Sequence, residues 1–147
     1  MIYIIIVMVL FTIELFIKNH IDKTKEIGKK QTIIKDELYI EYTQNKGAFY
    51  SLFEDKPKVV CGISTILSGI MGIIYGVLLS KKGNVILKIG MSILMAGALS
   101  NVYDRIKRKY VVDYLYLKRL KKIVFNLADV FIVLGSFIVS IVEIFKD

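Results

Sequence analysis

This 147-residue chain is poor in the residues on which many enzymes depend. Cys61 is its single cysteine, which excludes an intramolecular disulfide framework and any zinc site built on several cysteines. His20 is its single histidine, which argues against a histidine-based metal centre and against a Ser-His-Asp triad. Tryptophan is absent and Pro57 is the single proline. Any chemistry must therefore come from carboxylates, hydroxyls, amides and basic groups, and we expect no metal and no other cofactor.

Apolar residues are abundant and come in blocks. They make up 55% of the sequence against 23% charged residues, and the mean hydropathy is +0.58. A chain of this composition cannot cover its own surface with polar groups, which excludes a disordered protein, a collagen-like repeat and an ordinary soluble enzyme. The length fits one domain, so we expect a single membrane domain over residues 1–147.

Four apolar stretches approach the length of about 20 residues that a helix needs to cross a bilayer. They cover about 1–17, 59–79, 85–103 and 126–145. The first lacks a basic start and a small-residue cleavage site, and it carries Glu14, so we interpret it as a retained span rather than a signal peptide. The fold class expected is an all-α membrane protein with four transmembrane helices.

A small β-sheet subdomain is expected on the membrane surface beside the spans. The polar segment at about 20–58 contains an alternating stretch, 37–43, that favours a strand, and 110–116 is also β-like. Tyrosines near these segments suit an interfacial aromatic belt. They are Tyr39, Tyr42, Tyr50, Tyr110, Tyr114 and Tyr116.

Small residues recur at every fourth position in the two middle spans, which predicts faces for close helix packing. In the second span these are Ser64, Ser68, Gly72 and Gly76. In the third span they are Ser92, Ala96 and Ser100.

The chain is basic, with a formal net charge of +8. Because the basic residues lie between apolar blocks, we interpret them as flanks of membrane helices near anionic lipid headgroups, and we expect no nucleic acid partner. Counting positive charges does not decide the topology. The short loop at 80–84 holds Lys81 and Lys82, but the two longer connections hold more basic residues and would be cytoplasmic by a simple count.

Two aspartates stand at the entry to the fourth apolar stretch, where a carboxylate is costly without a partner or a task. Asp113 lies between β-branched and aromatic residues, and Asp129 follows Asn126 by three positions, which places these two on one helix face. Two neighbouring carboxylates tend to share one proton, so one can activate water while the other protonates a carbonyl oxygen. The alternative for Asp129 is a polar helix face or an interfacial N-cap.

The end of the third span carries a second polar set. Gly97, Asn101 and Arg105 lie four residues apart on one helix face. Arg105 can donate to a carboxylate through two parallel hydrogen bonds. Asp104, beside it, suits a helix cap or a salt bridge.

Five motifs in one order resemble the bacterial lipoprotein signal peptidases, also called signal peptidase II. They lie at 14–18, 45–51, 97–105, 111–114 and 125–129. In that order they are similar to the family patterns D-x-x-x-K, N-x-G-A-F-S, G-x-x-x-N-x-x-D-R, V-V-D-F and F-N-x-A-D. The chain departs from these patterns at Glu14, where Asp is usual, at Ser100, where Gly is common, and at Phe49 and Tyr50.

The resemblance implies a membrane aspartyl protease with Asp113 and Asp129 as its catalytic pair. It implies further residues that bind substrate or support the pair. These are Asn45, Gly47, Asn101, Asp104, Arg105, Asn126, Glu14 and Lys18. The implied reaction removes the signal peptide of a diacylglyceryl-modified prolipoprotein just before the lipidated cysteine.

The same resemblance implies a multi-pass protein of the bacterial inner membrane with its active site at the extracytoplasmic face, against the simple charge count. The partners expected are the lipid-modified prolipoprotein and membrane lipids, and we expect a monomer.

Two non-catalytic alternatives remain. A small transporter would use Asp113 and Asp129 as an ion relay or to join helices, and it predicts an inverted repeat or broken helices, which the sequence does not show. A lipoprotein-binding relative without activity predicts the loss of one acid, yet both are present.

Overall fold

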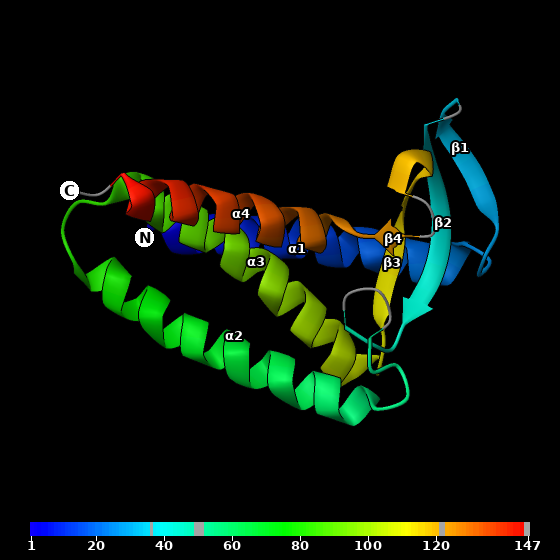
Figure 1. The fold of residues 1–147 in the computed structure, drawn as a ribbon, viewed down its shortest axis with the longest axis horizontal. Coiled ribbons are helices and arrows are strands. Elements are labelled where there is room, and N and C mark those ends of the chain that lie inside the picture. The colour runs from blue at the N-terminus through cyan, green and yellow to red at the C-terminus, as the bar shows by residue number, and fades with distance from the viewer. Residues whose placement is uncertain (36, 49–51, 121–122, 146–147) are drawn as a thin grey trace.

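The computed structural model describes residues 1–35, 37–48, 52–120 and 123–145. The helices found there are α1 (Ile2–Thr24), α2 (Pro57–Ser80), α3 (Val85–Lys107), the short η2 (Lys118–Leu120) and α4 (Leu127–Ile144). The strands are β1 (Lys30–Ile34), β2 (Leu38–Asn45), β3 (Val111–Leu117) and β4 (Val124–Phe125). Figure 1 shows the long helices running along one axis, with the sheet across one end and both chain termini at the other.

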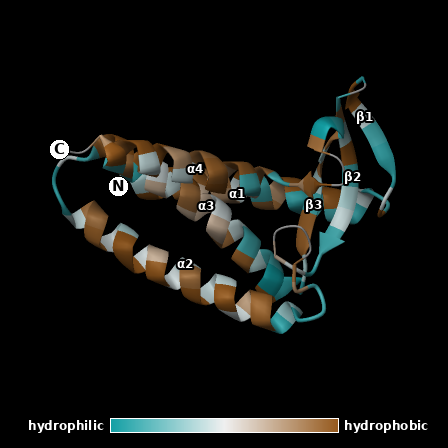
Figure 2. Cartoon of the chain, viewed as in Figure 1, coloured by the Kyte–Doolittle hydropathy of each residue, from teal (hydrophilic) through white to brown (hydrophobic). Residues whose placement is uncertain are grey.

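All four long helices have the length and apolar character to cross a membrane. Large apolar side chains point outward from the bundle: Phe16 is 74% exposed, Ile73 71% and Val133 69%. Figure 2 shows this apolar surface along the helices and polar residues gathered toward the sheet. Continuous apolar surface of this kind is stable against lipid chains rather than water. The prediction of a multi-pass membrane protein with four spans is confirmed.

Helix α3 is the centre of the bundle, packed against α1, α2 and α4. Its backbone comes closest to α4, where a methyl group added at Gly97 would lie 2.3 Å from the carbonyl oxygen of Ala128. A methyl group at Gly135 would lie 2.5 Å from the amide nitrogen of Leu94. Only glycine permits so close an approach, so these residues fix where α4 begins relative to α3.

The predicted packing face is confirmed on α3, and on α2 it holds for Ser64, Ser68 and Gly72, which are buried or half-buried, but not for the exposed Gly76. On α3, all three small residues are buried. On α2, Ser68 is buried, but a methyl group at Gly72 would meet only the end of Met95, and one at Gly76 would meet nothing within 4 Å. The reason is that α2 contacts α3 loosely, while the close contact falls on glycines outside the four-residue pattern.

The sheet is antiparallel in the order β1-β2-β3-β4. Val112 and Tyr114 on β3 pack against Ile21 at the end of α1 and Tyr42 on β2. Because side chains alternate along a strand, Val111 and Asp113 face the opposite side. The register pairs Asn45 with Val111 and Thr43 with Asp113, so polar side chains of β2 lie beside Asp113.

Several predicted boundaries were wrong. The first span was expected to end near residue 17, but α1 continues to Thr24 because Ile21 packs against the sheet and Asp22 accepts from Tyr42 and Tyr110. The segment at 20–58 was expected to supply the sheet, yet α1 and Pro57–Ser80 occupy its two ends. The β-like stretch predicted at 110–116 is confirmed as β3, which completes the sheet together with β4 from the same connection.

Two tyrosines of the predicted aromatic belt are also placed differently. Tyr42 is 2% exposed and Tyr114 is 4% exposed, so both belong to the core beneath the sheet rather than to an interface. Their hydroxyls find polar partners there, Asp22 and Glu14 respectively. Tyr50 lies outside the described residues.

Candidate active site

Asp113 is held by two side-chain amides. It is 3% exposed, on the face of β3 that points away from the core beneath the sheet. Asn126 donates to its Oδ1 (2.6 Å), and Asn45 donates to its Oδ2 (3.1 Å). Both carboxylate oxygens therefore accept a hydrogen bond from a fixed donor.

Asp129 sits in the first turn of α4 and forms a capping box with Asn126. The side-chain oxygen of Asn126 accepts from the Asp129 amide N–H (3.0 Å), and Asp129 Oδ2 accepts from the Asn126 amide N–H (3.1 Å). Such reciprocal bonds satisfy backbone donors that a helix N-terminus leaves free. The prediction of one shared helix face was wrong, because Asn126 precedes the helix as its N-cap. The N-cap is Asn126 and not Asp129, which stands at the third helical position as its partner in the capping box.

Asn101 on α3 completes the contacts of Asp129. Its side-chain nitrogen donates to Asp129 Oδ1 (2.8 Å), while its oxygen accepts from the Lys18 ammonium (2.8 Å). The ammonium has no acceptor, so it can pair only with the amide oxygen. Lys18 thereby fixes which end of the Asn101 amide faces Asp129.

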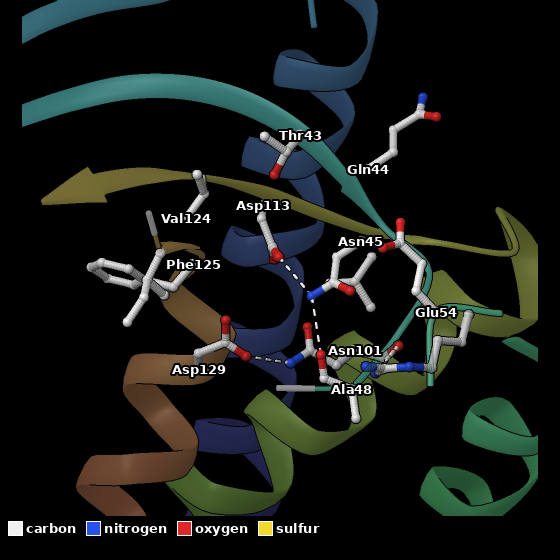
Figure 3. Close-up of a pocket in the computed structure, with 13 residues that line it drawn as sticks. Thr43, Gln44, Asn45, Ala48, Glu54, Asn101, Asp113, Val124, Phe125 and Asp129 are labelled. Atoms are coloured by element: carbon white, nitrogen blue, oxygen red, sulfur yellow. Dashed lines mark hydrogen bonds between the residues drawn. The ribbon is translucent and has the colours of Figure 1, made fainter. Parts of the chain in front are cut away.

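The two aspartates face one cavity of about 410 Å³ at the sheet end of the bundle. Figure 3 shows Asp113 coming from the strand and Asp129 from the start of α4, with Asn45 and Asn101 beside them. The lining combines polar residues of β2, α3 and α4 with apolar ones. The apolar ones are Ala48, Val111, Ile123, Val124 and Phe125. A cavity with both kinds of wall suits an extended peptide with apolar side chains.

The electrostatics of the cavity favour a proton on Asp113. Burial, and then the negative charge of Asp129, raise the pKa of Asp113 to about 7, although hydrogen bonds from Asn45 and Asn126 and the charge of Lys18 oppose the shift. The cause is that burial disfavours the charged form and a second carboxylate adds repulsion. Asp113 can thus carry a proton near neutral pH.

Arg105 contacts backbone rather than a carboxylate. Its terminal nitrogens donate to the carbonyl oxygens of Gly47 (3.1 Å) and Asn101 (3.3 Å). The expected paired hydrogen bonds to a carboxylate are not among the contacts of the described residues, and Arg105 Nε is buried there without an acceptor. Gly47 in turn donates its N–H to the side chain of Asn45 (2.9 Å), so Arg105 fixes the turn that follows β2.

Behind the site lies a fully buried group of charges. The Lys18 ammonium lies 3.1 Å from Asp104 and 3.7 Å from Glu14, and all three residues are 0% exposed. Asp104 also accepts from Arg108 and from the amide N–H of Val112 (3.1 Å). The salt-bridge alternative for Asp104 is confirmed, and the group ties α1 and α3 to β3.

The structure brings all ten sequence-predicted residues to this end of the bundle, in two layers. Asn45, Asn101, Arg105, Asp113 and Asp129 line the cavity, with Asn126 between the aspartates. Gly47 shapes the rim, and Glu14, Lys18 and Asp104 lie behind. The predicted motif also includes residues 49–51, which lie outside the described residues.

Sequence reasoning missed two contributors, Tyr114 and Arg108. Tyr114 was expected in an interfacial aromatic belt. Arg108 belongs to a run of basic residues that is typical of a solvated helix end. Nothing in the local pattern marks Arg108 as a partner of Asp104. The alternation of β3 was the available signal for Tyr114, since it places Tyr114 opposite Asp113.

The comparison with family models decides the family. Residues 6–145 match the model described as signal peptidase (SPase) II. The chain belongs to the signal peptidase II family. It is accordingly a membrane-spanning protease, as the five motifs indicated.

Curated relatives agree with this family assignment. A lipoprotein signal peptidase of Clostridium tetani is 34% identical over 85% of this chain and 81% of its own length. A lipoprotein signal peptidase of Fusobacterium nucleatum is 31% identical over 99% of this chain and 87% of its own length. A lipoprotein signal peptidase of Clostridium acetobutylicum is 35% identical over 86% of this chain and 82% of its own length. The likeness therefore covers most of each signal peptidase chain rather than one motif.

Solved structures show the same fold. Two structures titled as bacterial membrane enzymes superimpose with TM-scores of 0.85 and 0.83 at 25% and 26% identity. They cover 97% and 99% of this chain, and 87% and 93% of their own. The four spans with a sheet at one end are thus the architecture of solved membrane enzymes.

Proposed function

We propose that this signal peptidase II removes the signal peptide of diacylglyceryl-modified prolipoproteins just before the lipidated cysteine, with Asp113 and Asp129 as the catalytic pair. The observation that carries the proposal is the placement of both carboxylates on one cavity by a shared residue, Asn126. The family membership supplies the substrate class. We further propose that one chain suffices, because each of these groups comes from a single chain.

In the proposed reaction the pair starts with one proton, carried by Asp113. Asp129 takes a proton from a water molecule as that water attacks the scissile carbonyl carbon, and Asp113 gives its proton to the carbonyl oxygen. The tetrahedral intermediate then collapses: Asp113 takes back a proton from one of the intermediate's hydroxyls, the C–N bond breaks, and the leaving nitrogen takes the proton held by Asp129. The products are a signal peptide ending in a carboxylate and a lipidated cysteine with a free amino group.

Other groups of the cavity bind the peptide backbone in this proposal. The buried Arg105 Nε can satisfy its missing hydrogen bond on a substrate carbonyl oxygen. The polar side chains of β2 that line the cavity offer further donors and acceptors. An extended peptide beside a strand is a common mode of peptide recognition.

The depth of the cavity fits a lipid-modified substrate. A peptide bond beside a diacylglyceryl cysteine is held at the headgroup level, because its acyl chains remain in the bilayer. The carboxylates lie at the ends of spans, where α4 begins and α3 ends, and apolar helix faces beside them can receive acyl chains. We propose that this end faces the extracytoplasmic side of the bacterial inner membrane.

The test is cleavage of a diacylglyceryl-modified prolipoprotein by purified enzyme in detergent, followed by gel shift and by the mass of the new N-terminus. We expect cleavage by the parent, and a loss of about 10²–10⁴-fold or more in Asp113→Asn and in Asp129→Asn, as for removal of a general acid or base. Glu54→Gln is the matched control, since Glu54 is an exposed carboxylate at the rim of the same cavity.

The outcomes separate the claims. A folded parent that leaves several lipid-modified substrates intact would contradict the proposed function. Cleavage that survives both aspartate substitutions would contradict the assignment of the pair. A Glu54→Gln variant as impaired as the aspartate variants would show that loss of any cavity charge stops the reaction.

A further inference from the structure

The first turn of α4 has an unusual set of acceptors. A helix leaves its first backbone N–H groups without intrahelical partners. Here the Leu127 N–H donates to the Tyr114 hydroxyl (3.3 Å), the Ala128 N–H to Glu14 Oε1 (3.3 Å) and the Asp129 N–H to Asn126 (3.0 Å). Three side chains from α1, β3 and the N-cap thus hold the turn that carries Asp129.

Tyr114 connects this turn to the strand of the other aspartate. It follows Asp113 directly, and strand alternation sends its side chain to the opposite face, where it is 4% exposed. Its hydroxyl donates to Glu14 Oε2 (2.7 Å) and accepts from Leu127. Burial, and then the charge of Glu14, raise the pKa of Tyr114, so the hydroxyl keeps its proton and remains the donor.

Glu14 is fixed independently of Tyr114. It is 0% exposed, and the Lys18 ammonium lies 3.7 Å from it. Lys18 is itself held by Asp104 (3.1 Å). A carboxylate at a helix N-terminus also interacts favourably with the helix dipole. Glu14 therefore presents one oxygen to α4 and one to β3 from a rigid position on α1.

We infer that the Tyr114 hydroxyl, held by Glu14, is a positioning group that sets the placement of Asp113 relative to Asp129 by joining β3 to the first turn of α4. This inference rests on the proposed function, because it concerns the geometry of the same pair. The hydroxyl touches neither carboxylate and acts through the backbone of the two elements that carry them.

The test compares Tyr114→Phe with Tyr116→Phe in the cleavage assay. Tyr116 lies on the same strand, packed against Tyr39 and beneath the Lys30 ammonium, away from α4. For Tyr114→Phe we expect kcat to fall about tenfold with KM changed less than twofold, since displaced reacting groups slow the chemical step more than binding. Tyr116→Phe should match the parent, and all three proteins should unfold within a few degrees of one another.

A double-mutant cycle with Glu14→Gln tests the route of the effect. Because Glu14 and the Tyr114 hydroxyl bond to each other and both accept from the first turn of α4, the loss in Glu14→Gln/Tyr114→Phe should be smaller than the sum of the two single losses. Additive losses would overturn the inference. So would a Tyr114→Phe variant with the parent's kcat, or one that loses activity only in proportion to a lowered unfolding temperature. These results require a cleaving parent, so they are distinct from failure of the proposed function, in which the parent itself does not cleave.

Discussion

Asn126 uses its backbone and side chain to hold both aspartates. Its backbone N–H and side-chain oxygen close the capping box with Asp129, and its side-chain nitrogen donates to Asp113 (2.6 Å) and to the Val112 carbonyl oxygen (3.3 Å). An aspartate at this position would keep the acceptor for the helix cap but lose the donor. Asparagine therefore suits a residue that caps a helix and binds a carboxylate at once.

The pKa of Asp113 predicts the pH dependence of cleavage. A raised pKa of about 7 means that Asp113 keeps its proton below neutral pH and loses it above. Because the proposed reaction needs that proton, kcat/KM should fall on the alkaline side with a midpoint near pH 7, by about tenfold per pH unit. The measurement is kcat/KM between pH 5 and 9 on a substrate without titratable groups beside the scissile bond.

Infrared difference spectroscopy supplies the control for that profile. A protonated Asp113 should give a carboxylic acid carbonyl band that disappears between pH 6 and 8 and is absent in Asp113→Asn. A rate that stays level to pH 9 would show that the proton of Asp113 is not required. An unchanged band in Asp113→Asn would assign the proton to another group.

At the scale of elements, the contact between α3 and α4 determines where Asp129 lies. Gly97 allows the backbone of α3 to approach the carbonyl oxygen of Ala128, one residue before Asp129. Asn101, one turn further along α3, is then close enough to donate to Asp129 (2.8 Å). Gly97 and the residue that donates to Asp129 are therefore parts of one helix face.

Gly97→Ala should therefore impair catalysis and stability together. The added methyl group would lie 2.3 Å from Ala128 O and 3.0 Å from Ile132, so α4 must move away. We expect destabilisation of about 1–3 kcal/mol, as for overpacked sites, and a fall in kcat of at least about tenfold. Thermal unfolding in detergent and the cleavage assay measure the two effects.

Gly69→Ala is the matched control for that substitution. It also adds one methyl group to a membrane helix, but nothing lies within 4 Å of the position. It should leave the unfolding temperature and kcat near the parent's values. Equal effects of the two substitutions would show that the close approach of α3 and α4 does not position Asp129.

At the scale of the whole molecule, the charges and the proposed topology oppose each other. The sheet end holds many basic residues, which a simple count would place in the cytoplasm. Several of them are paired with acids of the same end, however. These pairs are Lys29–Glu26, Lys30–Glu41, Arg119–Glu37 and Arg108–Asp22. The net positive charge at that end is therefore smaller than the count of basic residues.

Cysteine labelling tests the topology. In a Cys61→Ser background, Lys29→Cys marks the sheet end and Lys82→Cys marks the opposite end, both at exposed positions. A membrane-impermeant maleimide should label the Lys29→Cys protein in intact spheroplasts, and the Lys82→Cys protein only after lysis. Labelling in the reverse order would place the site in the cytoplasm and follow the charge count instead.

Much of the architecture could be predicted from the sequence, because hydropathy and alternation are local quantities. The four spans, the strand near 37–43 and the two aspartates were all identified. Helix ends were less predictable, since α1 continues past Lys18 to Thr24, where Ile21 packs against the sheet among polar neighbours. A prediction from hydropathy ends the span at the first polar residues, although the helix itself continues.

The burial of individual polar groups was outside the reach of the sequence. Tyr114 was expected at a surface, and Arg105 was expected to bind a carboxylate. Their actual partners depend on which helix and which strand meet, and no local pattern contains that information. The Tyr114–Glu14 hydrogen bond joins residues 100 positions apart, and the Asn45–Asp113 bond joins residues 68 apart.

The sequence by itself thus determined how many times the chain crosses the membrane and which acids stand at the ends of the spans, because apolar length and residue type are properties of single segments. The tertiary structure decided that Asp113 and Asp129 share one cavity and one bridging amide. That outcome requires two non-local arrangements, the register of β2 on β3 and the close approach of α4 to Gly97. Both are set by packing between segments. In the sheet, a shift of β3 by one residue would turn Asp113 to the other face.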